Sequence, residues 1–318
     1  MDEQVLKVDE QHHKLRLDVY LTQALSDNPS RTFVKNLIES GGVLVNQKTV
    51  KAHHKVAIGD EVRVRAGDVQ ALAAGHVLPE NIPLNIFYED KYLIVINKPA
   101  GLLVHPVKGC QTGTLVNALL YYCSAQPGRG LSDAHLPPED GTTSPEEFRP
   151  GIVHRLDRET SGLIVVAKDN TTHVRLARQF EKHRVKKRYA ALVRGNVEYD
   201  EGEIDAPIGR HPGHFDKKAV SYSDAAKKAV TRYRVIDRFD RTRNLVALFP
   251  QSGRTHQLRV HMAHLGHPIL GDEKYGSKSS FPRLALHAQG IGFTHPQTKQ
   301  WIEFSIPVPQ EFLAVKAK

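Results

Sequence analysis

The sequence has little of what secreted and membrane proteins depend on. It contains two cysteines in 318 residues, Cys110 and Cys123, which are too few and too close together for a disulfide framework. No apolar run approaches the roughly 18 residues of a membrane span, and the start is polar and acidic where a secretory signal has a basic end. We therefore expect a cytoplasmic protein that is neither exported nor inserted into a membrane.

Phosphate-binding glycine loops of the two standard patterns are also missing, and no internal repeat is evident. What the sequence does have is positive charge. Its 44 Lys and Arg against 35 Asp and Glu give a net charge of +9, with a pI of about 9.4. This balance indicates an anionic partner. The length favours two domains, and a hydrophobic content of 40% excludes global disorder.

The first domain is predicted over residues 12–70. Apolar periodicity predicts helices at 16–25 and 30–42, the second capped by Ser30, followed by strands at 43–50 and 60–66. Arg31 and Lys35 remain on the solvent side of the second helix. They either contact phosphates or simply form a solvated face.

Small residues, Gly and Pro predict a linker over residues 71–83, and a second domain over 84–318. Strands outnumber helices there and do not alternate regularly with them, so the expected class is α+β with a mixed, largely antiparallel sheet. One strand is predicted at 151–156. The acidic segment 124–148 is predicted to be an exposed insertion.

A cluster of polar residues, HRLDRETSG at 154–162, lies between two apolar strands. Connections between strands often carry active sites. Asp157 is flanked by Arg155 and Arg158, so it can be partly desolvated and still stay ionised, as a reactive carboxylate must. The alternative is an aspartate in a structural ion-pair network.

This segment, together with KRYAAL at 187–192 and GRTHQLRVH at 253–261, resembles the signature of the RluA-type family of pseudouridine synthases. The helix-helix-hairpin pattern of residues 12–70 resembles an S4-type RNA-binding domain. The resemblance implies isomerisation of uridine to pseudouridine within RNA, without a cofactor or metal. It favours large-subunit ribosomal RNA, free or in a ribosome precursor, over transfer RNA.

The resemblance also implies roles for individual residues. Asp157 matches the essential aspartate, which either attacks the ribose C1′ or removes the C2′ proton; both roles require the ionised form. Tyr189 matches the tyrosine that packs on the flipped base, with a core aromatic as the alternative. Arg155 matches the arginine that fills the gap left by the base. Arg259 matches the arginine that pairs with the catalytic carboxylate, and Arg254 is the competitor.

Residues 155–194 carry eleven Lys and Arg against four Asp and Glu, which predicts a surface that follows the RNA backbone. Singly, each of these residues could be part of a solvated face. The RNA-binding residues predicted for the second domain are Arg155, Arg254, Arg158, His154 and Lys187.

Three other hypotheses have less support. A metal site among His256, His261, His264 and His267 lacks a cysteine or well-placed carboxylate to complete it. A hydrolase triad of Ser161, His154 and Asp157 is crowded into one short loop. A noncatalytic RNA-binding assembly factor would not need Asp157 beside the phosphates. We therefore expect a monomeric RNA pseudouridine synthase.

Overall fold

A computed structural model describes residues 3–25, 31–39, 41–65, 77–107, 110, 112–124, 151–240, 242–276 and 281–314. The chain divides into two compact units, one of Met1–Leu84 with Leu103–Gly151 and one of Asn85–Leu102 with Ile152–Lys318. None of the helices in these described residues is long and apolar enough to cross a lipid bilayer.

The first unit contains a small antiparallel sheet with strand order β1-β3-β2. Its elements are β1 (Glu3–Lys7), the 3₁₀ helix η1 (Glu10–His12), α1 (Leu17–Ala24), α2 (Arg31–Glu39), β2 (Val43–Val45), β3 (Glu61–Arg65) and α4 (Leu115–Ser124). The sequence does not predict β1, because its residues are mostly polar and its Val5 side chain is exposed. The two helices and β3 agree with the sequence prediction.

The predicted apolar stripe of α2 faces the core of this unit. Val34, Leu37 and Ile38 are buried together with residues of α1 and the sheet. The hairpin after α2 turns at Asn46 and Gln47, whose φ angles of 49° and 66° are typical of a type I′ turn. The strand predicted at 43–50 therefore ends at Val45, and beyond the turn only a single bridge joins Lys48 to Val45.

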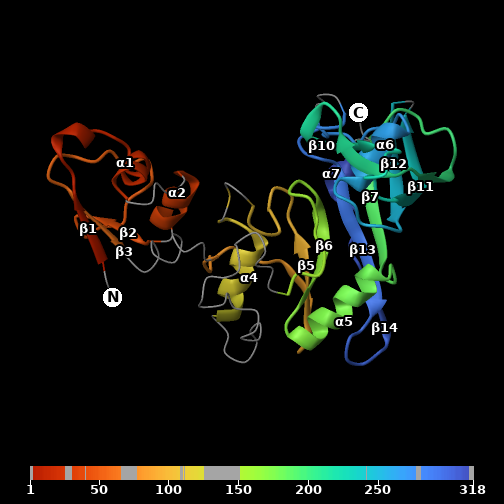
Figure 1. Ribbon diagram of the computed structural model, residues 1–318, viewed down its shortest axis with the longest axis horizontal. Coiled ribbons are helices and arrows are strands. Elements are labelled where there is room, and N and C mark those ends of the chain that lie inside the picture. Colours follow the sequence, from red (N-terminus) through yellow and green to blue (C-terminus); the bar gives the residue numbers. More distant parts are fainter. Residues whose placement is uncertain are drawn as a thin grey trace. The chain divides into compact units, whose positions relative to one another are not determined.

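The second unit is built on a nine-stranded sheet, counted over the described residues, with the order β4-β5-β6-β13-β7-β12-β11-β8 and with β14 paired to β13 (Figure 1). The strands are β4 (Ile86–Glu89), β5 (Leu93–Lys98), β6 (Ser161–Ala167), β7 (Lys186–Arg194), β8 (Glu201–Asp205), β11 (Val230–Asp240), β12 (Arg243–Pro250), β13 (Leu286–Thr294) and β14 (Trp301–Ser305). A separate hairpin pairs β9 (Ile208–His211) with β10 (His214–Val220). The helices are α5 (Asn170–Glu181), α6 (Gln257–His264) and α7 (Gln310–Leu313).

The pairing of β6 with β13 is parallel, whereas the other strand pairs in the described residues are antiparallel. This confirms the α+β class with a mixed, largely antiparallel sheet. Gly162 at the start of β6 has φ 113°, and a Cβ there would lie 2.3 Å from the Ala288 carbonyl oxygen. Only glycine allows this close approach of β6 to β13.

The strand predicted at 151–156 is wrong. In this segment only Ile152 forms a bridge, to Val166. The His154 ring explains the difference, because its Nε2 accepts a hydrogen bond from the Val165 N–H at 3.0 Å. The His154 side chain therefore occupies the Val165 N–H of β6, next to the bridge at Val166, and residues 153–160 form a loop instead of a strand.

Several predictions fall outside the described residues. They are the Ser30 helix cap, the Arg31 side chain and nearly all of the insertion at 124–148. Residues 71–76 of the predicted linker also lie outside, whereas Val77 in its middle is described and buried. The domain boundaries at 12–70, 71–83 and 84–318 stay predictions.

Candidate active site

The Asp157 carboxylate lies on the loop that leads into β6, and its side chain is 19% exposed. The loop turns tightly here, since the Thr160 N–H donates to the Asp157 carbonyl at 3.1 Å. A second loop fixes it from the side: the Gly101 N–H donates to the Arg158 carbonyl at 2.8 Å, and Arg158 Nε donates back to the Gly101 carbonyl at 3.1 Å. The Asp157 carboxylate is thus partly accessible, while the backbone of the next residue, Arg158, is held in place by Gly101.

Lys98 is fully buried at the end of β5, next to this loop. Its ammonium donates to the carbonyls of Pro99, Leu102 and Arg158 at 2.8, 2.8 and 3.1 Å. Burial lowers the pKa of Lys98 to about 8. The ammonium form therefore still dominates at neutral pH, and its three donors match three backbone acceptors.

Arg259 on α6 contacts Asp157 from the opposite side of the cavity, with Nη1 3.5 Å from Oδ2. Its two remaining nitrogen positions, Nε and Nη2, each donate to a carboxylate oxygen of Asp272 at 2.7 Å. Asp272 is buried. Arg259 thus makes a bidentate pair with Asp272 and a single contact with Asp157, and the bidentate pair fixes the guanidinium that faces Asp157.

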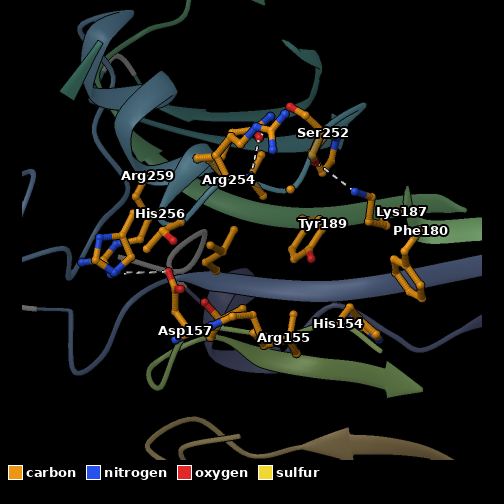
Figure 2. Close-up of a pocket in the computed structure, with 18 of the residues that line it drawn as sticks. His154, Arg155, Asp157, Phe180, Lys187, Tyr189, Ser252, Arg254, His256 and Arg259 are labelled. Atoms are coloured by element: carbon orange, nitrogen blue, oxygen red, sulfur yellow. Dashed lines mark hydrogen bonds and ion pairs between the residues drawn. The ribbon is translucent and has the colours of Figure 1, made fainter. Parts of the chain in front are cut away.

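A cavity of about 480 Å³ opens between the Asp157 loop, β7 and the segment that precedes α6. Tyr189 on β7 lies in the middle of it, between Asp157 at one end and Lys187 at the other (Figure 2). Burial, and next the charge of Asp157, raise the pKa of Tyr189, so the phenol is neutral at physiological pH. The volume is within the range of about 300–1,000 Å³ typical of small-molecule sites.

Lys187 donates to the Ser252 carbonyl at 2.9 Å, and burial lowers its pKa to about 8. His154 lines the same part of the cavity and stacks on Phe180 of α5, with ring centroids 4.5 Å apart and an angle of 18°. Burial, and then the charge of Lys187, lower the pKa of His154 to about 3. The imidazole is neutral and already bonded within the fold, so the RNA contact predicted for His154 stays a prediction, with Nδ1–H as its donor.

The other predicted RNA-binding residues are more exposed. Arg155 and Arg158 are exposed on the catalytic loop, and Lys35 lies 3.7 Å from Glu39 on α2. Arg254 lines the cavity, but its Nε donates to the Lys228 carbonyl at 3.1 Å. Arg259, rather than its competitor Arg254, is therefore the arginine that contacts the Asp157 carboxylate.

The alternative hypotheses gain no support from the geometry. Ser161 pairs with His287 at 2.8 Å rather than with His154. His261 is buried, and its ring is bonded to Thr231 and to the Ala206 carbonyl. No group of three or more metal-ligating side chains occurs in the part of the chain that the structure describes.

Sequence reasoning missed Asp272 and Tyr275, which lie in the segment GDEKYG at 271–276. Tyr275 lies under the Arg259 guanidinium, 5.1 Å from its carbon to the ring centroid. The two flanking glycines are the available signal, because Gly271 has φ 72° and a Cβ there would lie 1.8 Å from the Arg283 carbonyl oxygen.

Comparison with known proteins identifies the chemistry that this site serves. Residues 92–264 match the family model described as RNA pseudouridylate synthase, and residues 15–62 match the S4 domain. An uncharacterized RNA pseudouridine synthase of Bacillus subtilis is 40% identical over 309 residues, which is 96% of this chain and 94% of the relative. The chain belongs to the RNA pseudouridine synthase family.

Other relatives of this synthase have more specific names. Ribosomal large subunit pseudouridine synthase D of Pseudomonas aeruginosa is 39% identical over 313 residues, covering 94% of this chain and 90% of the relative. Among solved structures, human RNA pseudouridylate synthase domain containing 4 aligns with a TM-score of 0.56 at 27% identity, over 73% of this chain and 91% of that one. The predicted reaction and the S4-type domain are thereby confirmed.

Proposed function

We propose that this pseudouridine synthase modifies uridine in large-subunit ribosomal RNA, with Asp157 as its catalytic carboxylate. The observation that carries the proposal is the arrangement of Asp157, Arg259 and Tyr189 around one cavity. These residues come from three segments far apart in the sequence. They supply what the isomerisation needs: an ionised carboxylate, a cation to hold it and a flat surface for the base.

Asp157 acts on the ribose, either by adding to C1′ or by removing the C2′ proton. Both steps use the ionised carboxylate, and the Arg259 guanidinium contacts it at 3.5 Å. Arg259 is rigid because two of its nitrogens are committed to the buried Asp272. It orients the carboxylate without moving toward the substrate.

Tyr189 receives the flipped uracil. Extruding a base from stacked RNA costs about a few kcal/mol, which stacking on an aromatic ring offsets. The neutral phenol suits this role, since a charged ring would need solvation in the cavity. Arg155, exposed two residues before Asp157, fills the space that the base leaves in the RNA.

The RNA backbone follows exposed cations around the cavity. Arg178, Lys182, Arg184 and Lys186 are exposed on α5, β7 and their connection, and Lys35 adds a cation in the S4-type domain. The names of the relatives favour ribosomal RNA as the target. We infer that the enzyme acts as a cytoplasmic monomer.

The test is tritium release from RNA labelled at uridine C5, offered separately as large-subunit ribosomal RNA and as transfer RNA. We expect release from ribosomal RNA by the wild-type enzyme and none by Asp157→Asn, which keeps nearly the same shape and still binds RNA. Release from transfer RNA alone would contradict the target. Activity of Asp157→Asn would contradict the role of the carboxylate.

A further inference from the structure

His256 has an unusual backbone conformation directly beside the catalytic carboxylate. It is the N-cap of α6, with φ 57° and ψ 19°, in the left-handed region that residues other than glycine rarely adopt. Such strain persists where the surrounding structure enforces it, often at functional sites. Here the conformation accompanies a ring that lines the cavity, with Nε2 3.9 Å from Asp157 Oδ2.

The proton on the His256 ring is placed by Tyr275. The Lys218 N–H of β10 donates to the Tyr275 hydroxyl at 2.9 Å, and that hydroxyl lies 2.7 Å from His256 Nδ1. The Tyr275 oxygen already accepts a hydrogen bond from Lys218, and its own proton is free to be donated. We infer that it is donated to His256 Nδ1. The proton of the neutral imidazole is then on Nε2, the nitrogen that faces Asp157.

One short loop sets both groups that approach Asp157. Asp272 Oδ1 accepts from the N–H groups of Lys274 and Tyr275, each at 3.0 Å, and the Asp272 carbonyl accepts from the Gly276 N–H at 2.9 Å. The same Asp272 holds Arg259 through its two carboxylate oxygens. Asp272 thus fixes Arg259, and Tyr275, three residues later, fixes His256.

We propose that His256 is a second positioning residue for Asp157, with its Nε2–H oriented by the Tyr275 hydroxyl. His256 and Arg259 both lie against Oδ2 of the carboxylate. This assigns Oδ1 to the ribose and removes the rotational freedom of the carboxylate. The inference rests on the proposed role of Asp157 and adds a residue that the sequence analysis considered only as a metal ligand.

The electrostatics suit a neutral donor at this position. Burial is the largest effect and lowers the pKa of His256. Among the neighbouring charges, the carboxylates of Asp157 and Asp272 raise this pKa, and the cations of Arg259 and Lys274 lower it. The ring therefore donates a hydrogen without adding a second full cation beside the Arg259 guanidinium. The 3.9 Å separation is longer than a hydrogen bond, and catalytic contacts that are long in a free enzyme often tighten when substrate binds.

The experiment measures single-turnover tritium release and RNA dissociation constants for His256→Phe, His256→Gln, Tyr275→Phe and the double variant His256→Phe/Tyr275→Phe. We expect His256→Phe to slow turnover about 10- to 100-fold, the usual effect of losing a hydrogen bond to a charged group, with RNA affinity unchanged. His256→Gln restores most of the rate, because its amide N–H replaces Nε2–H.

Tyr275→Phe keeps the ring under Arg259 and removes only the hydroxyl. It slows the wild-type enzyme and has no further effect in the His256→Phe background, because the hydroxyl acts through His256. The matched control is His264→Phe, an exposed histidine on the same helix, which leaves the rate unchanged. Independent, multiplicative effects of the two substitutions, or a loss confined to RNA affinity, would overturn the inference.

A second measurement does not depend on activity. Long-range ¹H–¹⁵N spectra of protein labelled on histidine report which ring nitrogen carries the proton, with the signal assigned by its loss in His256→Gln. We expect Nε2–H in the wild type and a mixture of tautomers in Tyr275→Phe. Nδ1–H in the wild type would refute the inference even in an active enzyme. A wild-type protein without tritium release would refute the proposed function instead.

Discussion

Replacing the buried Lys98 by methionine tests how the catalytic loop is held. Lys98→Met keeps the length of the side chain and removes the ammonium. Three backbone carbonyls, of Pro99, Leu102 and Arg158, then lose a donor that lies 2.8 to 3.1 Å away. The Arg158 carbonyl belongs to the residue after Asp157, so the change reaches the active site through the backbone.

The magnitude follows from two opposing effects. The Arg158 carbonyl keeps the Gly101 N–H as a donor at 2.8 Å, so two carbonyls, of Pro99 and Leu102, are left without one. A buried acceptor without a partner costs about 1–3 kcal/mol, so two of them cost roughly 4 kcal/mol. Removing the charge recovers the desolvation penalty, which the lowering of the Lys98 pKa from 10.5 to about 8 puts at about 3 kcal/mol. We therefore expect Lys98→Met to lower the free energy of unfolding by about 1 kcal/mol, and turnover by at least about 10-fold because Asp157 is less well placed.

The assay is urea unfolding followed by Trp301 fluorescence, together with single-turnover tritium release under conditions where the variant is fully folded. Lys91→Met is the matched control, since Lys91 is exposed and its replacement leaves both quantities unchanged. A Lys98→Met variant as stable as the wild type and equally fast in turnover would refute the reasoning, because the carbonyls of Pro99 and Leu102 would then be satisfied without the ammonium.

Three further predictions concern stability and RNA binding. The pKa of His154 is lowered from 6.5 to about 3 in the folded protein, so below pH 6.5 the His154 imidazole becomes protonated in the unfolded chain before it does in the folded one. Acidification therefore lowers the free energy of unfolding, and the contribution of His154 at pH 5 is a loss of about 2 kcal/mol. Urea unfolding should show this loss in the wild type and not in His154→Phe. Gly271→Ala should cost more than about 2 kcal/mol in the same assay, because its Cβ meets the Arg283 carbonyl, whereas Gly266→Ala, with φ 86° and open space, should cost about 1. Arg184→Gln should weaken RNA binding and reduce the slope of log affinity against log salt by about 0.7 to 0.9 in filter binding; an unchanged slope would remove Arg184 from the phosphate contacts.

The sequence was sufficient to predict the class of the sheet and to select residues that meet at one cavity. Asp157, Tyr189 and Arg259 come together around the cavity as the three motifs predict. Continuous apolar runs mark strands such as β7 and β12, because the consecutive residues at their centres are buried on both faces of the sheet. Motifs and apolar runs can be recognised within a short stretch of sequence, without knowledge of the fold.

The contacts made by buried polar side chains could not be predicted in this way. Lys98 reads as an ordinary surface lysine, and Asp272 as a turn residue, yet both are buried and bonded. The His154 ring takes the place of a backbone acceptor beside β6, where the sequence predicts a strand at 151–156. Each of these roles depends on a partner brought near by the fold, at a distance in sequence that no local pattern encodes.

The parallel pairing of β6 with β13 has a consequence for the order in which the protein becomes functional during synthesis. Ser161 and His287 are bonded across this pair although 126 residues separate them in the chain. The sheet of the S4-type domain, by contrast, is complete at Arg65. Since domains fold as they emerge, a nascent chain can present its RNA-binding sheet long before β13 exists to complete the catalytic sheet. The growing polypeptide therefore gains affinity for RNA first and the ability to modify it last.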